Sequence, residues 1–211
     1  GIKNVLCLSG YHQTLSGCPE SANVYDIDSI QFIEMVASMS GKGMLIDGTK
    51  IGGQFSMFVG AVANPFLKPL ELNMLRLVKK VEAGARFIQT QAVFDVEAFG
   101  QWLGAAAREG VTEKAAILAG ILPLDSADEA RKLRDTYTDY HIPDAVIERL
   151  KAAGGADAQR KEGVAICIET IGKLSKMKGL RGIHVLSGGK EKVVPEIIAG
   201  AGLDKLAAGK A

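Results

Sequence analysis

The stretch that decides the fold runs from Phe55 to Asp95 and reads FSMFVGAVANPF (55–66), LELNMLRLVKKVEAGA (70–85) and RFIQTQAVFD (86–95). Its first part is rich in β-branched and aromatic residues and stops at Asn64-Pro65, because proline cannot continue a central strand. Gly84 is placed as a C-cap glycine between the second and third parts. The stretch therefore predicts a strand, a crossover helix and a second strand parallel to the first.

The middle part of this stretch has the periodicity of a helix. Leu72, Leu75 and Val78 fall on helical spacing. Lys79 and Lys80 lie in the last turns, where positive charge suits the helix dipole. Without other information, these two lysines indicate a solvated helix end.

Polar residues stand at the far end of the second strand, where a purely structural strand would carry more valine or isoleucine. They are Gln89, Thr90 and Gln91. In parallel α/β proteins, ligand chemistry usually lies at the carboxyl ends of the strands. Gln91 can equally be a residue that only caps its strand, so both interpretations stay open at this point.

Composition limits the class of protein. The chain has 211 residues, of which 47% are hydrophobic, so it can bury a substantial core as a single domain. Its net charge of +1 gives no basic field for nucleic acid. No apolar run approaches the roughly 18 residues of a membrane span, and no signal-peptide pattern appears.

The cysteines and histidines favour neither a disulfide nor a metal centre. Cys7, Cys18 and Cys167 are odd in number and widely spaced, which predicts reduced thiols in a cytoplasmic setting. No CxxC, HxxxH or HExxH motif is present, so we expect no protein-held metal. His12 and His184 lack a partner at catalytic spacing, and we interpret both as structural or exposed.

The strand and helix pattern repeats along the chain. Strands are predicted near residues 4–10, 55–63, 86–93, 115–122 and 182–188, each followed by a helix. Such repeats imply a parallel sheet with right-handed crossovers. From the pattern alone, two architectures are open: a doubly wound sheet, or the last five units of a (β/α)8 barrel. The absence of GxGxxG after the first strand weakens the dinucleotide-binding option.

Several runs taken together resemble a known family. They are GIKNVLCLSG (1–10), NVYDIDSI (23–30), VGAVANP (59–65), RLVKKVEAGARFIQTQAVFD (76–95) and AGILPL (119–124). In this order they resemble methylenetetrahydrofolate reductase, especially the bacterial form found alongside C1-fixing pathways. The block from Lys79 to Asp95, joined to the GILPL run, is the most specific part of the resemblance.

The resemblance implies an α/β fold, the parallel (β/α)8 TIM-type barrel, of which this chain supplies about the last five βα units. We expect residues 1–203 to form the C-terminal part of this single barrel and residues 204–211 to be a frayed tail. The first three units, one of which carries the family's catalytic glutamate, have no counterpart here. No residue of this chain is therefore assigned as the catalytic acid.

The resemblance also implies a binding site for a flavin, FMN or FAD, and for the folate. The expected cofactor-binding residues are Ser9, Gly10, Tyr25, Asp26, Val62, Asn64, Asn73, Arg76, Lys79 and Lys80. Gln91 matches the glutamine that hydrogen-bonds the pterin ring, and is the expected substrate-binding residue. Tyr11 stands where the family has an aspartate that tunes the flavin, and tyrosine supplies no fixed negative charge at neutral pH. Leu186 and Lys190 replace the family's aromatic residue and arginine after the last strand.

Two functions follow from these comparisons of motifs. The first is flavin-dependent reduction of methylenetetrahydrofolate to methyltetrahydrofolate, with electrons from NAD(P)H or from a partner electron-transfer subunit. The second is a non-catalytic or assembly subunit with the same fold in a larger redox complex. Five barrel units leave two open sheet edges, so we expect an oligomer or a multi-subunit complex, with no nucleic acid and no membrane span.

Overall fold

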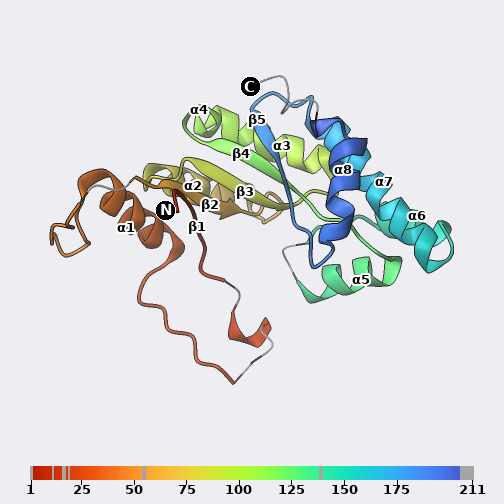
Figure 1. Ribbon diagram of the computed structural model, residues 1–211, viewed down its shortest axis with the longest axis horizontal. Helices are drawn as coiled ribbons and strands as arrows, with labels where there is room; N and C mark the ends of the chain where they lie inside the picture. Colours follow the sequence, from red (N-terminus) through yellow and green to blue (C-terminus); the bar gives the residue numbers. More distant parts are fainter. Residues whose placement is uncertain are drawn as a thin grey trace.

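The computed structural model describes residues 2–10, 12–15, 18, 20–53, 56–137 and 140–204. Within them one parallel sheet has the strand order β1-β2-β3-β4-β5, which is also the order of the strands along the chain (Figure 1). The strands are β1 (Asn4–Cys7), β2 (Phe58–Ala63), β3 (Phe87–Ala92), β4 (Ala116–Ile121) and β5 (Leu180–Val185). The predicted order and parallel direction are confirmed, and each strand is shorter than predicted.

Helices fill the connections between the strands. They are α1 (Ser29–Lys42), α2 (Leu70–Glu82), α3 (Val96–Arg108), α4 (Val111–Lys114), α5 (Ala127–Thr136), α6 (Asp144–Ala152), α7 (Ala156–Leu174) and α8 (Val194–Gly200), with 3-10 turns η1 (Gln13–Leu15) and η2 (Glu191–Val193). Among the described residues, no helix is long and apolar enough to cross a membrane.

The side chains of the strands alternate between a covered and an open face of the sheet. In β3, Ile88, Thr90 and Ala92 are buried, whereas Phe87 and Gln91 between them are only partly buried. Most buried apolar residues of β1 to β4 belong to one core with residues of α1, α2, α3 and α7, such as the Phe99–Trp102 pair, and Ala92 belongs to a second, smaller cluster. Helices therefore cover one face of the sheet.

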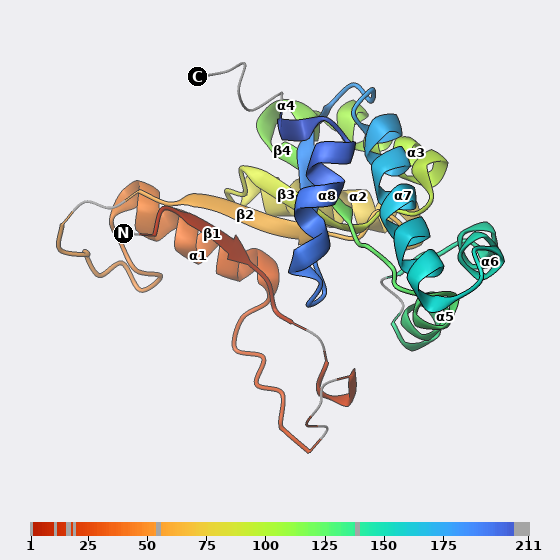
Figure 2. The same ribbon diagram turned by 45° about the vertical axis from the view of Figure 1, so that its right-hand side comes forward.

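This one-sided cover decides between the two architectures that the sequence left open. A doubly wound sheet reverses its strand order and carries helices on both faces. Here the order is sequential from β1 to β5 and the sheet forms an arc, which is the arrangement of a TIM-type barrel (Figures 1 and 2). The chain supplies five consecutive βα units of such a barrel.

Local signals set several helix ends. The Asp28 side chain accepts hydrogen bonds from the amides of Ile30 and Gln31, and the Gln31 side chain bonds back to the Asp28 amide, which makes a capping box. After α2, Gly84 has a φ of +118°, which favours glycine at this turn into β3. Asp28 is therefore the residue that starts α1.

The buried face of α2 is not the one that Leu72 and Leu75 suggest. Its buried residues are Met74, Leu77 and Val81. Leu72 and Leu75 are 51% and 52% exposed. Apolar residues occur almost all round the N-terminal half of this helix, so the helical spacing identified the helix and not its inward face.

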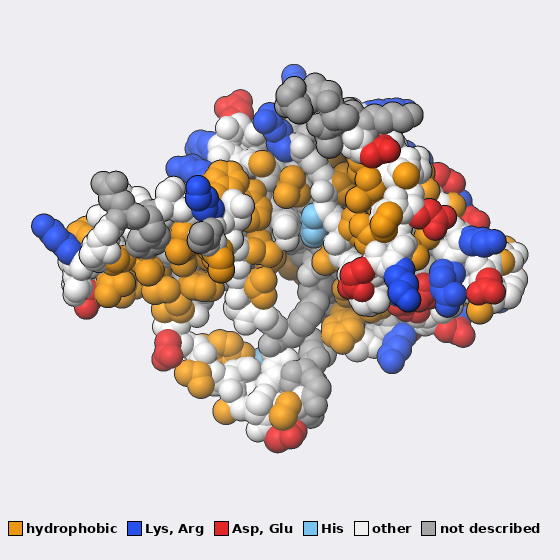
Figure 3. All heavy atoms as spheres, viewed as in Figure 1, with side chains coloured by type: hydrophobic (Ala, Val, Ile, Leu, Met, Phe, Trp, Pro, Cys, Tyr) orange, Lys and Arg blue, Asp and Glu red, His pale blue; other side chains and the backbone are white. Residues whose placement is uncertain are grey.

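The connection between β1 and α1 stands away from the sheet. Its described residues loop out below the strands, and the molecule is hollowed between this segment and the sheet (Figures 1, 2 and 3). Tyr11, expected to replace the family aspartate, lies outside the described residues. The tail from residue 205 onward does as well, so the predicted boundary at residue 203 stays a prediction.

A close backbone contact makes one glycine of α7 necessary. A Cβ at Gly163 would lie 1.9 Å from the carbonyl oxygen of Leu124, in the segment that follows β4. Gly163→Ala should therefore lower the free energy of unfolding by about 1–3 kcal/mol, because α7 must move outward. Gly172 lies on the same helix with open space around it, and Gly172→Ala should raise stability by up to about 1 kcal/mol. Urea unfolding of both variants measures the difference, and equal shifts would contradict this packing.

Candidate functional site

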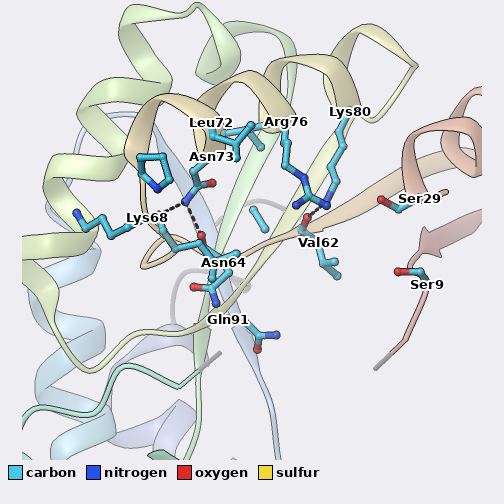
Figure 4. A pocket seen from close by; sticks show the side chains of 14 residues that line it. Ser9, Ser29, Val62, Asn64, Lys68, Leu72, Asn73, Arg76, Lys80 and Gln91 are labelled. Atoms are coloured by element: carbon cyan, nitrogen blue, oxygen red, sulfur yellow. Dashed lines mark hydrogen bonds between the residues drawn. The ribbon is translucent and has the colours of Figure 1, made fainter. Parts of the chain in front are cut away.

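A cleft of about 390 Å³ lies beside the carboxyl half of β2. Its walls come from α2 and from the connection between β2 and α2, and Ser9 and Ser29 close it on the opposite side (Figure 4). The Arg76 and Lys80 side chains reach from α2 toward the backbone of Val62 (Figure 4). The cleft therefore combines cationic groups, amides and exposed backbone at one end of the sheet.

The structure brings together most of the residues expected to bind the flavin and folate. Seven of them line this cleft: Ser9, Val62, Asn64, Asn73, Arg76, Lys80 and Gln91. Gly10 and Tyr25 line a neighbouring cavity of about 300 Å³ that shares Ser9 and Ser29 with the cleft. Asp26 and Lys79 are exposed and line neither cavity. Residues far apart in the sequence are thus collected in two adjoining cavities.

The cleft also contains residues that sequence reasoning missed. They are Ser29, Ala63, Leu67, Lys68, Pro69, Leu72 and Leu77, from the end of β2, the first turn of α1, helix α2 and the connection before α2. The NPFLKP run was a usable signal, because two prolines close together restrict a connection to few conformations. Leu72 lies on α2, as its spacing predicts, and it also lines the cleft.

Lys80 is the cationic group most enclosed by the cleft. Its Nζ donates a hydrogen bond of 2.7 Å to the carbonyl oxygen of Val62. Burial lowers the pKa of Lys80 below its usual value, the positive charge of Arg76 lowers it further, and Asp28 opposes the shift. An ammonium group whose charged form is disfavoured in this way gains from an anion placed beside it.

Asn73 ties α2 to the connection that precedes it. Its Nδ2 donates hydrogen bonds to the carbonyl oxygens of Asn64, at 2.8 Å, and Leu67, at 3.1 Å. The Asn64 side chain in turn accepts a bond of 3.0 Å from the amide of Phe66. These bonds hold the wall of the cleft in one conformation, with the Asn73 side-chain amide directed at the backbone of Asn64 (Figure 4).

The ammonium group of Lys190 is enclosed by other groups of this chain, whereas a cation that binds a folate tail must be accessible to it. The Nζ of Lys190 lies 2.6 Å from an oxygen of Glu129, 2.8 Å from the carbonyl oxygen of Pro123 and 3.8 Å from an oxygen of Asp125. Leu186 packs against the smaller core cluster around α5, α6 and α7. The lysine is therefore neutralised by two carboxylates at the ends of β4 and β5.

Other chemistries find no support in the part of the chain that the structure describes. No group of three or more histidine, cysteine, aspartate and glutamate side chains there could hold a metal ion. Cys7 and Cys167 are buried thiols, and Cys18 is exposed. Burial raises the pKa of the Cys167 thiol to about 12, so it is not a nucleophile at neutral pH.

Comparisons with known proteins agree on one family. The family model described as methylenetetrahydrofolate reductase matches residues 1–202. A probable methylenetetrahydrofolate reductase (NADPH) of Caenorhabditis elegans is 24% identical over 98% of this chain and 29% of its own length. The 5,10-methylenetetrahydrofolate reductase of Escherichia coli is 26% identical over 87% of this chain and 55% of its own. The chain thus spans about half or less of the length of these relatives.

One solved structure overlaps the fold in part. It is an uncharacterized protein from Clostridium thermocellum, described as binding two copies of 5-methyl-5,6,7,8-tetrahydrofolic acid. It matches 72% of this chain and 55% of its own at 18% identity, with a TM-score of 0.48.

The two bonds of Asn73 have a testable energetic role. Asn73→Ala removes the donors to Asn64 and Leu67, and should lower the free energy of unfolding by about 1–2 kcal/mol. Leu72→Ala, one residue earlier and half exposed, should change it by less than about 0.5 kcal/mol. Chemical denaturation gives both values, and amide hydrogen exchange over residues 64–69 should accelerate only in Asn73→Ala. Equal exchange in the two variants would show that Asn73 does not organise the connection.

Proposed function

The chain belongs to the methylenetetrahydrofolate reductase family, and we propose that it forms the flavin- and folate-binding part of an enzyme that reduces methylenetetrahydrofolate to methyltetrahydrofolate. The observation that carries the proposal is the cleft beside β2, which gathers seven of the residues that the resemblance assigned to this function. They come from four separate segments of a chain whose residues 1–202 match the family.

The chemistry of the donor set fits a flavin with its phosphate. Only one of the three N–H groups of Lys80 is used in its bond to Val62, and Arg76 brings a second cation into the same cleft. A phosphate dianion needs such charge-assisted donors when it leaves water. Asn64 and Asn73 add amides along the same wall, as a ribityl chain with several hydroxyls requires. FMN and FAD both satisfy this description.

When bound, the flavin would supply the hydride that the folate receives. The residues of this chain would bind the flavin and the folate and orient them toward each other. Lys80 and Arg76 would hold the phosphate side of the flavin, and Asn64 would lie beside its ring. Gln91, at the end of β3, carries both a donor and an acceptor on one amide, and would hydrogen-bond the pterin ring. The electron donor, NAD(P)H or a partner subunit, the cytoplasmic location and the oligomeric state stay predictions.

A non-catalytic or assembly subunit with the same fold is the second candidate. Exposed leucines favour it, because Leu67, Leu72 and Leu75 are 42%, 51% and 52% exposed around the start of α2. Tyr11 favours it too, because it replaces a family acid. This candidate requires a folded protein that binds neither flavin nor folate.

The test of the proposal is flavin content and turnover of the purified protein. Lys80→Gln keeps a hydrogen-bond donor and removes the charge, so flavin affinity should fall by about ten- to hundredfold, the equivalent of roughly 1.5–3 kcal/mol. Lys132→Gln on α5 is the matched control and should retain flavin. Gln91→Ala should retain flavin and impair folate turnover, because its expected partner is the pterin.

Visible absorbance after gel filtration measures retention, and the oxidation of methyltetrahydrofolate with an artificial acceptor measures turnover. A wild-type protein that stays colourless with added FMN and FAD would contradict the proposal and support the assembly subunit. Unchanged flavin content in Lys80→Gln, with flavin present in the wild type, would mean that the flavin does not use this cleft.

A further inference from the structure

The pairing of β3 with β4 contains an irregularity next to Gln91. Gln89 of β3 pairs with Leu118 of β4, and the next pair is Ala92 with Gly120. Three residues of β3 are thus matched by two of β4, which is a β-bulge with one extra residue on β3. The extra residue falls at Thr90 and Gln91, at the strand end that faces the cleft.

The Thr90 side chain bonds to the backbone of both strands at this irregularity. Its Oγ1 accepts a hydrogen bond of 3.0 Å from the amide of Gly120 and donates one of 2.9 Å to the carbonyl oxygen of Gln91. Thr90 is only 2% exposed, so water does not substitute for either bond. The hydroxyl therefore links the Gly120 amide of β4 to the Gln91 carbonyl of β3 at the point where the register shifts.

A histidine from the next strand but one completes the arrangement. His184 of β5 pairs in register with Gly120, and its Nε2 donates a hydrogen bond of 2.8 Å to the carbonyl oxygen of Thr90. The imidazole thus spans β4 at the position of Gly120. Burial lowers the pKa of His184, although the bond to Thr90 opposes the shift, so the neutral ring with its proton on Nε2 is the favoured form.

Gly120 is the residue that permits this close approach. A Cβ at this position would lie 2.6 Å from the carbonyl oxygen of Thr90 and 2.9 Å from that of Gln91. Distances this short between a Cβ and backbone atoms do not occur without displacement of one strand. The bulge of β3 and the glycine of β4 are therefore one structural unit with Thr90 and His184.

We propose that Thr90 and His184 are positioning residues that hold the bulge and thereby aim the Gln91 amide at the ligand. Shifting a strand by one residue turns its side chains to the opposite face of the sheet. If β3 relaxed to regular pairing, Gln91 would sit opposite Gly120 and every residue beyond it would change partner. The side-chain bonds of Thr90 and His184 oppose that relaxation. This inference rests on the proposed function, in which Gln91 binds the pterin ring.

Two substitutions at Thr90 separate the effect of its hydroxyl group from the effect of the shape of its side chain. In the purified protein, Thr90→Val should raise the KM for the folate by about tenfold, with flavin content unchanged. Thr90→Ser keeps the hydroxyl and should remain within about threefold of wild type. Thr170→Val, at a buried threonine of α7, is the matched control and should leave KM unchanged. An equal loss in Thr90→Ser would overturn the role of the hydroxyl.

His184 is tested in the same assay. His184→Leu should raise the folate KM as Thr90→Val does, and His184→Gln, which keeps a donor, should recover part of the loss. The decisive measurement repeats Thr90→Val and His184→Leu in a Gln91→Ala background. If both residues act through Gln91, neither changes turnover further by more than about twofold. A loss of the same size in both backgrounds would overturn the proposal.

A measurement that needs no turnover keeps this proposal distinct from the proposed function. The side-chain amide signals of Gln91, identified by their loss in Gln91→Ala, should shift or broaden in Thr90→Val and His184→Leu and stay unchanged in Thr170→Val. The backbone amide of Gly120 should exchange faster in Thr90→Val. Unchanged Gln91 signals would overturn the positioning role. Shifted signals in a protein without folate binding would contradict only the proposed function.

Discussion

The rest of the structure depends on one constraint, that a parallel sheet whose crossover helices all lie on one side must curve. The small buried residues Ala61, Ala63 and Ala119 let the helices approach the sheet closely, and the opposite face keeps half-buried side chains such as Phe87. Curvature brings the carboxyl ends of neighbouring strands together. That convergence is why Val62 and Gln91, which do not pair with each other, line one cleft.

The environment of Lys80 disfavours its positive charge, and an anionic ligand would relieve that cost. Its ammonium group is partly removed from water and lies near Arg76, and both effects lower its pKa. The bond to the Val62 carbonyl is a charge-assisted one, typically worth about 1.5–3 kcal/mol. The Val62 carbonyl accepts from one N–H of the ammonium group and brings no negative charge to balance it. Among the residues that the structure describes, no carboxylate forms an ion pair with Lys80 or Arg76. Two neighbouring cations in this situation are costly in a structural role and suited to an anionic ligand.

The sequence was sufficient for the elements and insufficient for several side-chain directions. The hydrophobic pattern and the turn residues located the five strands, because signals such as Asn64-Pro65 and Gly84 act locally. The inward face of α2 was not predictable, since Leu72 and Leu75 are as apolar as the buried Leu77. The environments of Lys190 and His184 depend on partners 61 and 94 residues away, Glu129 and Thr90, and no local pattern reports such pairs. Most residues that the resemblance assigned to the site line one of the two adjoining cavities, whereas Asp26 and Lys79 line neither.

The first turn of α1 also borders the cleft, and the N-terminus of a helix is a common anion site, but the cap of α1 argues against that role. Both the Ile30 and Gln31 amides donate to one oxygen of Asp28 at 2.8 Å, so the helix donors nearest the cleft are already occupied. The Asp28 carboxylate also carries negative charge at the place that a phosphate would approach. Its attraction to Lys80 raises the pKa of that lysine, which a phosphate would do as well. In the proposed function, anion recognition in this cleft would therefore depend on the side chains of α2, with Asp28 limiting how far the anion can lie toward α1.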